Sequence, residues 1–242
     1  MQHALKTVFA ALVFLLVLET TFAIHEYGHL REFQKNKVPV KEFSLGIGYP
    51  LYQHHGAEFT FSIRAIPIAA YVMPTEGGNE SIYGKLPIKN KIIVSAAGIR
   101  NNFAVSLMLL FFFQVLGWKK GYLSPKELIK TMLYTPIKII LLFFAFMLGC
   151  LTLGIVDLKE KFLLSTGKIT PPKIIMGFLF WNLVLGLVNV APILPMDGGR
   201  IAQDLLPISI AHSMAKIATP LLIFFMISAN LQKFRILEAD IK

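Results

Sequence analysis

The chain is poor in cysteine and in charge. A single cysteine among 242 residues excludes a disulfide within the chain. Charged residues make up 16% of the sequence, well below the roughly 25% of soluble domains. A formal net charge of +10 is compatible with nucleic-acid binding, but no basic cluster with interleaved aromatic residues is present. The basic residues lie between apolar segments instead, which fits loops beside anionic lipid and argues against a nucleic-acid partner.

Apolar residues are abundant. They make up 55% of the chain, and the mean hydropathy is +0.62. A helix that crosses a bilayer needs about 20 mainly apolar residues. Five stretches approach or exceed that length: residues 4–24, 92–118, 139–156, 174–196 and 208–232. The sequence therefore predicts an α-helical polytopic integral membrane protein, located in the cell membrane and in contact with the lipid bilayer.

The first apolar stretch ends in an HExxH motif, His25-Glu26-Tyr27-Gly28-His29. Two histidines four residues apart project from the same face of a helix, so both imidazoles can reach one metal ion. The glutamate between them is placed to act as a general base on water at that metal. Residues 1–23 could alternatively be a signal peptide, but cleavage there would remove the helical turns that support the motif.

A small β-structure is predicted after this helix. Residues 59–64 alternate strictly, with Phe59, Phe61 and Ile63 on one face, which is typical of a half-buried strand. Together with residues 43–49 this strand predicts a β-hairpin at the membrane surface. His54 and His55 lie in the expected turn, where a solvated position is favoured over metal binding.

A proline-broken segment supplies an acidic residue near the end of the fourth apolar stretch. Pro192 and Pro195 interrupt the helix just before Asp197. Broken backbone at membrane depth is tolerated only beside protein or a water-filled cavity, so Asp197 is expected to face such a cavity. The alternative is an ordinary loop aspartate at an interfacial helix end. A catalytic zinc takes three protein ligands, and Asp197 is the candidate with the most distinctive context to join the two histidines.

These motifs together resemble the site-2 protease family of intramembrane zinc metalloproteases. The resemblance adds Gly98 to Asn102, which is similar to the family's GxxxN, and residues 189–198, which fit its NxxPxxPxDG pattern. It covers roughly residues 5–118 and 174–230. It implies a Zn²⁺ cofactor and a single-span membrane protein as substrate. The implied site residues are His25, His29 and Asp197 as zinc ligands, Glu26 as catalytic base, and Asn102 and Asn189 as contacts for the substrate backbone or the oxyanion.

The chain departs from the family pattern in places. Ile99 stands where a proline is usual, and Ala69-Ala70 replaces a common Gly-Gly. The bacterial members that this chain most resembles carry periplasmic PDZ domains between the second and third core helices, where this chain has only a short connection and the apolar segment 139–156. Control of substrate entry by PDZ domains is therefore not expected.

We expect a single domain, residues 1–242, built from a three-helix catalytic core and a C-terminal span. Its predicted parts are a first core helix at 4–30, a membrane-associated β-hairpin at 42–73, a second core helix at 92–118, a third core helix with the aspartate motif at 174–198, and the span at 208–230. If the first and third core helices share one metal, they must cross in the same direction. The segment 139–156 is then expected to be interfacial, re-entrant or a hairpin, unless 174–196 does not cross simply.

The predicted activity is hydrolysis of a peptide bond within or near the transmembrane segment of a substrate, and strand 58–66 is expected to receive the unwound substrate by edge addition. Two alternatives stay open. One is a non-catalytic membrane scaffold with the same fold, which would have no need of Glu26. The other is a metal-binding protein or transporter, which would require more ionisable residues along its spans.

Overall fold

The computed structural model describes residues 2–75, 81–121 and 171–207 continuously, with isolated residues in 124–137 and 209–216. The chain divides into two compact units, residues 1–109 with 168–207 and residues 110–167 with 208–242. The site considered below lies within the first unit. The predicted segment 139–156, and nearly all of 208–230, lie outside the described residues, and the single-domain assignment stays a prediction.

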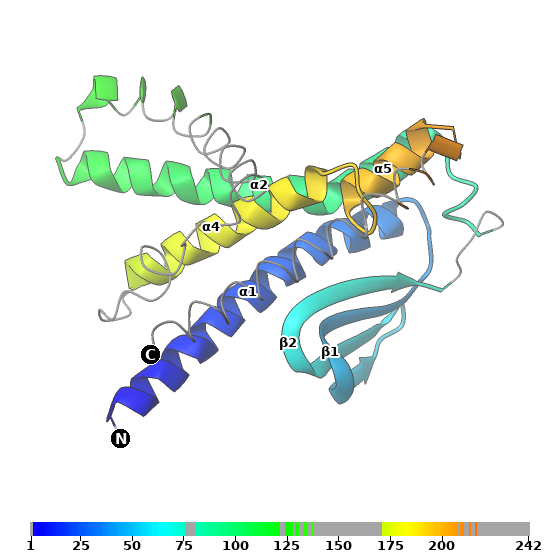
Figure 1. Ribbon diagram of the computed structural model, residues 1–242, viewed down its shortest axis with the longest axis horizontal. Helices are drawn as coiled ribbons and strands as arrows, with labels where there is room; N and C mark the ends of the chain where they lie inside the picture. The colour runs from blue at the N-terminus through cyan, green and yellow to red at the C-terminus, as the bar shows by residue number, and fades with distance from the viewer. Residues whose placement is uncertain are drawn as a thin grey trace, which may run out of the picture. The chain divides into compact units, whose positions relative to one another are not determined.

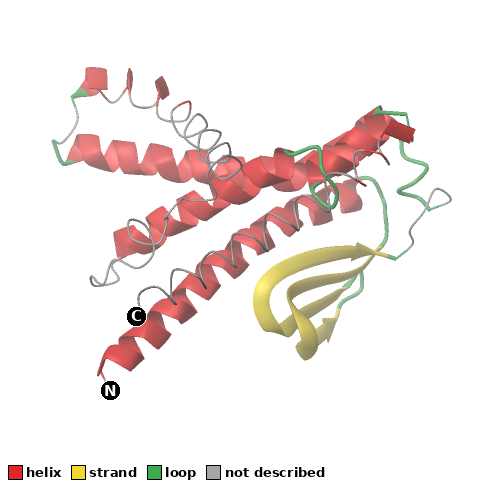
Figure 2. Cartoon of the chain, viewed as in Figure 1, coloured by secondary structure: helices red, strands yellow, loops and turns green. Residues whose placement is uncertain are grey.

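The described chain is mostly helical, with one small sheet (Figures 1 and 2). Its helices are α1 (Gln2–Lys35), α2 (Ile88–Lys119), α4 (Pro171–Val190) and α5 (Asp197–Leu205). Within α1 and α2, the segments Val8–Lys35 and Ile88–Lys119 are long and apolar enough to cross a membrane, and Ile174–Val190 is a shorter apolar helix. Only 17% of the most apolar window of each long helix is buried. Apolar side chains left exposed in this way are consistent with the predicted membrane protein.

Side-chain contacts give the relative directions of the three core helices. Thr21 of α1 lies beside Asn182 of α4. His25, four residues after Thr21, contacts Asp197, which follows Asn182 in the sequence. The α1 helix and the chain from α4 into α5 therefore run in the same direction. Asn102 of α2 contacts His25, whereas the earlier residue Val94 contacts His29, so α2 runs the opposite way. This is the arrangement that a shared metal requires of the first and third core helices.

The C-terminal end of α1 is fixed by a Schellman motif. Lys37 has a positive φ of 56°, and its N–H donates to the carbonyl oxygen of Gln34 at 3.0 Å. The next residue, Val38, donates to the carbonyl oxygen of Phe33 at 2.9 Å. Both bonds satisfy carbonyl groups that a helix end leaves without partners. Val38 and Phe33 also share one hydrophobic cluster with Val40 and Phe43, so the turn directs the chain into the sheet.

Strands β1 (Val40–His55) and β2 (Thr60–Pro74) form the expected antiparallel hairpin, but each strand also bends back on itself. Gly46 and Gly48 provide the bend in β1, with φ values of +80° and +86° that other residues rarely adopt. Residues 42–45 consequently pair with two different parts of β2, namely 60–63 and 70–73. The curved ribbons of this sheet are seen beside α1 in Figure 1.

This folding back corrects the expectation that strand 58–66 receives a substrate. Residues 60–63 pair with 42–45 on one side and with 52–55 on the other. Their backbone groups therefore lie in the interior of the sheet. Within the described part of the chain, residues 70–74 have a β-neighbour on one side only. The edge next to α1 is thus formed by the end of β2.

Candidate metal centre

Three side chains that are far apart in the sequence converge in the first unit. His25 and His29 lie one turn apart on α1, and Asp197 is the first residue of α5. The Asp197 Oδ2 atom lies 3.0 Å from His25 Nε2 and 3.2 Å from His29 Nε2. The two Nε2 atoms are 3.3 Å apart. All three residues are 5% exposed, so the three atoms form a small buried cluster.

The hydrogen-bond partners of the two imidazoles fix their tautomers. His29 Nδ1 lies 2.8 Å from the carbonyl oxygen of Val94, which can only accept a hydrogen bond. His25 Nδ1 lies 2.6 Å from the amide oxygen of Asn102, another acceptor. Both Nδ1 atoms must therefore carry the proton, which leaves a lone pair on each Nε2 in the neutral form.

This arrangement fits a metal ion. Two unprotonated Nε2 atoms and a carboxylate oxygen face one another with no hydrogen between them, and Asp197 Oδ2 has no hydrogen-bond donor. Acceptor atoms buried together without a donor repel one another unless a cation lies among them. Ligands bound tetrahedrally to zinc at about 2.0–2.1 Å are about 3.3 Å apart, close to the separations found here. His25, His29 and Asp197 would hold such an ion.

The break after α4 positions Asp197. The helix ends at Val190, and short turns through 191–196 carry the chain into α5. The Asn189 side chain bridges this break, because its amide nitrogen donates to the Leu185 carbonyl at 3.0 Å and its oxygen accepts from the Asp197 N–H at 3.4 Å. The predicted range 174–198 had placed Asp197 at the end of the third core helix. In the structure Asp197 instead begins a separate helix, α5.

Close approach of α2 to α1 requires a glycine at position 98. A Cβ atom there would lie 2.5 Å from His25 Nε2 and 2.6 Å from His29 Nε2, well inside van der Waals contact. The absence of a side chain lets the α2 backbone form one wall of the site. The carbonyl of Val94, one turn earlier on α2, then reaches His29.

Glu26 lies beside this cluster on α1, where it meets the sheet. Its Oε2 atom accepts a hydrogen bond of 3.1 Å from the backbone N–H of Val72 in β2. This bond joins the predicted catalytic base to the β2 edge described above. His54 and His55 lie on the exposed end of β1, away from this cluster.

Asn102 is fully buried, and both ends of its amide group are engaged within the protein. Its oxygen faces His25, and its nitrogen donates to Asn182 Oδ1 at 2.9 Å and to the Thr21 carbonyl at 3.4 Å. Thr21 and Asn182 were not predicted from the sequence as parts of the site. A signal for Asn182 was present, because an amide within an otherwise apolar membrane segment usually needs a partner on a neighbouring helix.

Comparison with known proteins agrees with this geometry. The sequence profile of peptidase family M50 matches residues 13–231. The chain belongs to peptidase family M50. The M50 profile spans all three residues of the candidate metal centre, and the family is one of membrane-embedded zinc metalloproteases. The two histidines and the carboxylate of the candidate metal centre are ligand types that zinc takes.

Individual relatives match over a shorter region. "Putative zinc metalloprotease slr1821" of Synechocystis sp. is 35% identical over 114 residues, which are 43% of this chain and 31% of that protein. "Putative zinc metalloprotease FN1322" of Fusobacterium nucleatum is 34% identical over 104 residues, 41% of this chain and 31% of that protein. The chain thus matches about a third of the length of these M50 relatives.

Proposed function

We propose that this M50 protein is an intramembrane zinc endopeptidase, which hydrolyses a peptide bond within or near the transmembrane segment of a single-span membrane protein. The observation that carries the proposal is the buried cluster of His25, His29 and Asp197, with Glu26 beside it. When bound, zinc lowers the pKa of a water molecule and so provides a nucleophile near neutral pH.

In this proposal Glu26 is the general base. Its carboxylate takes a proton from the attacking water and returns it to the leaving amine nitrogen. The hydrogen bond from Val72 supports this role, because before the substrate binds it holds one carboxylate oxygen at the strand edge and restricts the orientation of the other. His25, His29 and Asp197 are the proposed ligands, each with its ligating atom directed into the cluster.

Asn102 and Asn189 fit supporting roles better than contact with a substrate. The amide group of Asn102 is used entirely by His25, Thr21 and Asn182. That of Asn189 bonds Leu185 and Asp197 across the helix break. We propose that the first orients a ligand histidine and that the second orients Asp197.

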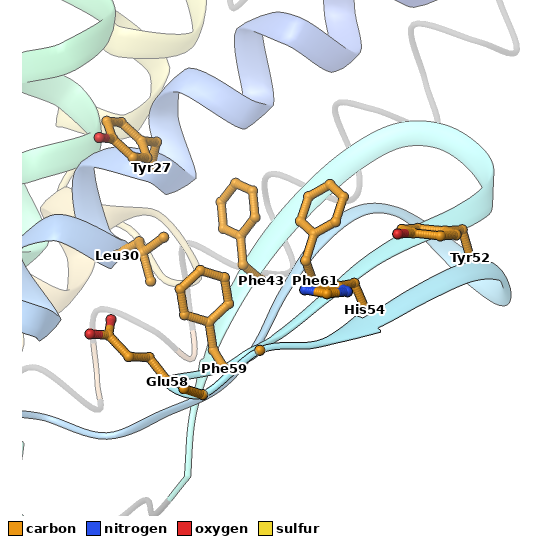
Figure 3. A pocket seen from close by; sticks show the side chains of 10 residues that line it. Tyr27, Leu30, Phe43, Tyr52, His54, Glu58, Phe59 and Phe61 are labelled. Atoms are coloured by element: carbon orange, nitrogen blue, oxygen red, sulfur yellow. The ribbon is translucent and has the colours of Figure 1, made fainter.

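The substrate is proposed to pair, as an extended strand, with residues 70–74 of β2. A transmembrane helix hides its peptide bonds, so it must unwind before attack, and an exposed strand edge offers hydrogen bonds to the unwound backbone. This edge is favoured because Val72 lies within it and already contacts Glu26. A groove of about 590 Å³ lies nearby between α1 and the sheet, and Figure 3 shows Tyr27 and Leu30 facing Phe43, Phe59 and Phe61 across it. Apolar substrate side chains would fit this lining.

A non-catalytic scaffold remains the second candidate, and it makes a different prediction for Glu26. A scaffold needs the metal and the fold but no base. The decisive experiment therefore compares wild type, Glu26→Gln and Asp197→Ala as detergent-purified proteins, with zinc analysis and cleavage of a panel of single-span substrates. We expect Glu26→Gln to retain zinc and to lose cleavage by roughly 10²–10⁴-fold.

Asp197→Ala separates the ligand from the base. We expect it to lose both zinc and cleavage, because two histidines alone leave the site with too few ligands. Equal cleavage by wild type and Glu26→Gln would exclude the proposed base. Zinc-loaded wild type that cleaves no substrate would favour the scaffold.

A further inference from the structure

A chain of buried amide groups runs from α4 to the metal centre. Asn182 is 0% exposed, and its Nδ2 donates to the Phe178 carbonyl at 2.8 Å and to Thr21 Oγ1 at 3.3 Å. Its Oδ1 accepts from Asn102 Nδ2 at 2.9 Å. The Asn102 oxygen then faces His25 Nδ1 at 2.6 Å. Asn182 is thus connected to a ligand histidine through one intervening side chain.

Each amide in this chain can point only one way. The Phe178 carbonyl can only accept, so Asn182 must direct its nitrogen there and its oxygen toward Asn102. Asn102 must then present its nitrogen to Asn182 and its oxygen to His25. The Phe178 carbonyl on α4 therefore determines, through the two amide groups, that an oxygen atom faces His25 Nδ1 on α1.

We propose that Asn182 is a positioning residue for the metal centre, because it fixes the Asn102 amide and thereby keeps His25 in the tautomer with a free Nε2 lone pair. The inference rests on the proposed ligand role of His25, and not on proteolysis itself. The hydrogen bonds of the Asn182 side chain go to Asn102, Thr21 and Phe178, and not to the proposed ligands.

Loss of Asn182 leaves Asn102 poorly held. The remaining partner of its Nδ2 is the Thr21 carbonyl at 3.4 Å, near the upper limit for a hydrogen bond. The Asn102 amide can then turn and offer its nitrogen to His25 Nδ1, which favours the tautomer protonated on Nε2. That tautomer cannot bind a metal through Nε2. Removing partners behind a ligand histidine typically weakens metal affinity by about 10–100-fold.

The test uses full-length protein in detergent and measures the zinc dissociation constant by competition with a chromogenic chelator. Asn182→Leu keeps the approximate size but removes every hydrogen bond, and we expect roughly ten-fold weaker zinc binding. The matched control is Leu179→Ala, a buried position on the same helix whose side chain is apolar and takes no part in the amide chain. It should lower the thermal unfolding temperature and leave the zinc dissociation constant unchanged.

Asn182→Asp tests the direction of the hydrogen bond. A neutral carboxylic acid at this buried position offers a donor to Phe178 and an acceptor to Asn102, so zinc affinity should recover toward wild type relative to Asn182→Leu. Two results would overturn the proposal. One is that Asn182→Leu weakens zinc binding no more than Leu179→Ala at equal loss of stability. The other is that Asn182→Asp binds zinc no better than Asn182→Leu. Neither measurement needs a substrate, so failure of the proposed protease activity would be seen separately.

Discussion

The backbone N–H of Val72 donates a hydrogen bond of 3.1 Å to the carboxylate of Glu26. This bond links the edge of the sheet to the proposed general base. A substrate strand that pairs with residues 70–74 would compete for the same N–H group. Binding of the substrate would then replace this hydrogen bond and free the Glu26 carboxylate from Val72.

Val72→Pro tests this link, because proline has no N–H to donate. We expect zinc binding to be retained and kcat to fall by at least ten-fold, about the effect of 1.4 kcal/mol. The matched control is Val72→Ala, which changes the side chain and keeps the N–H, and it should retain most of the activity. Wild-type turnover by Val72→Pro would contradict the role of this bond.

The acceptor atoms that face one another in the metal centre lead to a second prediction. Without zinc, Asp197 Oδ2 has two lone-pair nitrogens as neighbours at 3.0 and 3.2 Å. In Asp197→Asn the amide can donate to one of these nitrogens, which removes the repulsion. We therefore expect Asp197→Asn to bind zinc more weakly than wild type but, in the zinc-free state, to unfold at a higher temperature.

Thermal unfolding of wild type and Asp197→Asn, with and without a chelator, measures which protein has the higher unfolding temperature in each state. Wild type should lose stability when zinc is removed, whereas Asp197→Asn should change little. If the zinc-free wild type is the more stable of the two, an imidazole Nε2 carries a proton that it donates to Asp197 in the absence of zinc.

Local patterns in the sequence predicted much of this structure. Helix geometry places His25 and His29 on one face, because four residues make about one turn. The prolines before Asp197 break the helix, which places Asp197 beside that break. The predicted helices at 4–30 and 92–118 lie within α1 and α2, and the hairpin at 42–73 lies within β1 and β2. These features are set by residues close together in the chain.

Features that depend on contacts between distant residues were not predictable. Alternation in 59–64 indicated a strand whose polar face is open, yet Ser62 is fully buried because β1 and β2 both bend back. Because of that bend, the exposed edge of the sheet is formed by residues 70–74 and not by the predicted strand 58–66. The orientation of Asn102 depends on Asn182 of another helix, and a single sequence carries no information on that pairing.

The buried face of the sheet gives a prediction about pH. Glu42 is 8% exposed, and its two carboxylate oxygens accept from Arg64 Nη2 at 2.7 Å and from the Tyr71 hydroxyl at 3.0 Å. Burial alone would raise the pKa of Glu42, but hydrogen bonds from Ser62, Arg64 and Tyr71 and the charge of Arg64 lower it below its ordinary value of 4.5. A carboxyl group with a lowered pKa in the folded state stabilises the protein above its ordinary pKa, and this stabilisation is lost as the pH falls through the folded-state value.

Wild type should therefore be more stable than Glu42→Gln at pH 7, by roughly 1–3 kcal/mol, and the difference should shrink as the pH falls below about 4.5. Unfolding by denaturant in detergent, followed by circular dichroism, gives the difference at each pH. Both proteins are measured without zinc, so that release of the metal at low pH does not contribute. A difference that stays constant from pH 7 to pH 3 would exclude this role for Glu42.

The closeness of α2 to the metal centre gives the last prediction. In Gly98→Ala the added methyl group would lie 2.5–2.6 Å from the two Nε2 atoms, so α2 or the imidazoles must move. Either shift separates the ligands or blocks the space among them, and we expect zinc affinity to fall by roughly 10–100-fold or more. Gly177→Ala in α4 is the matched control, because a Cβ atom there meets nothing within 4 Å. It should retain wild-type zinc affinity and unfold at the same or a slightly higher temperature, since alanine favours helix over glycine. Zinc competition on both variants measures the contrast directly, and equal affinity in the two would mean that α2 lies farther from the histidines than this site requires.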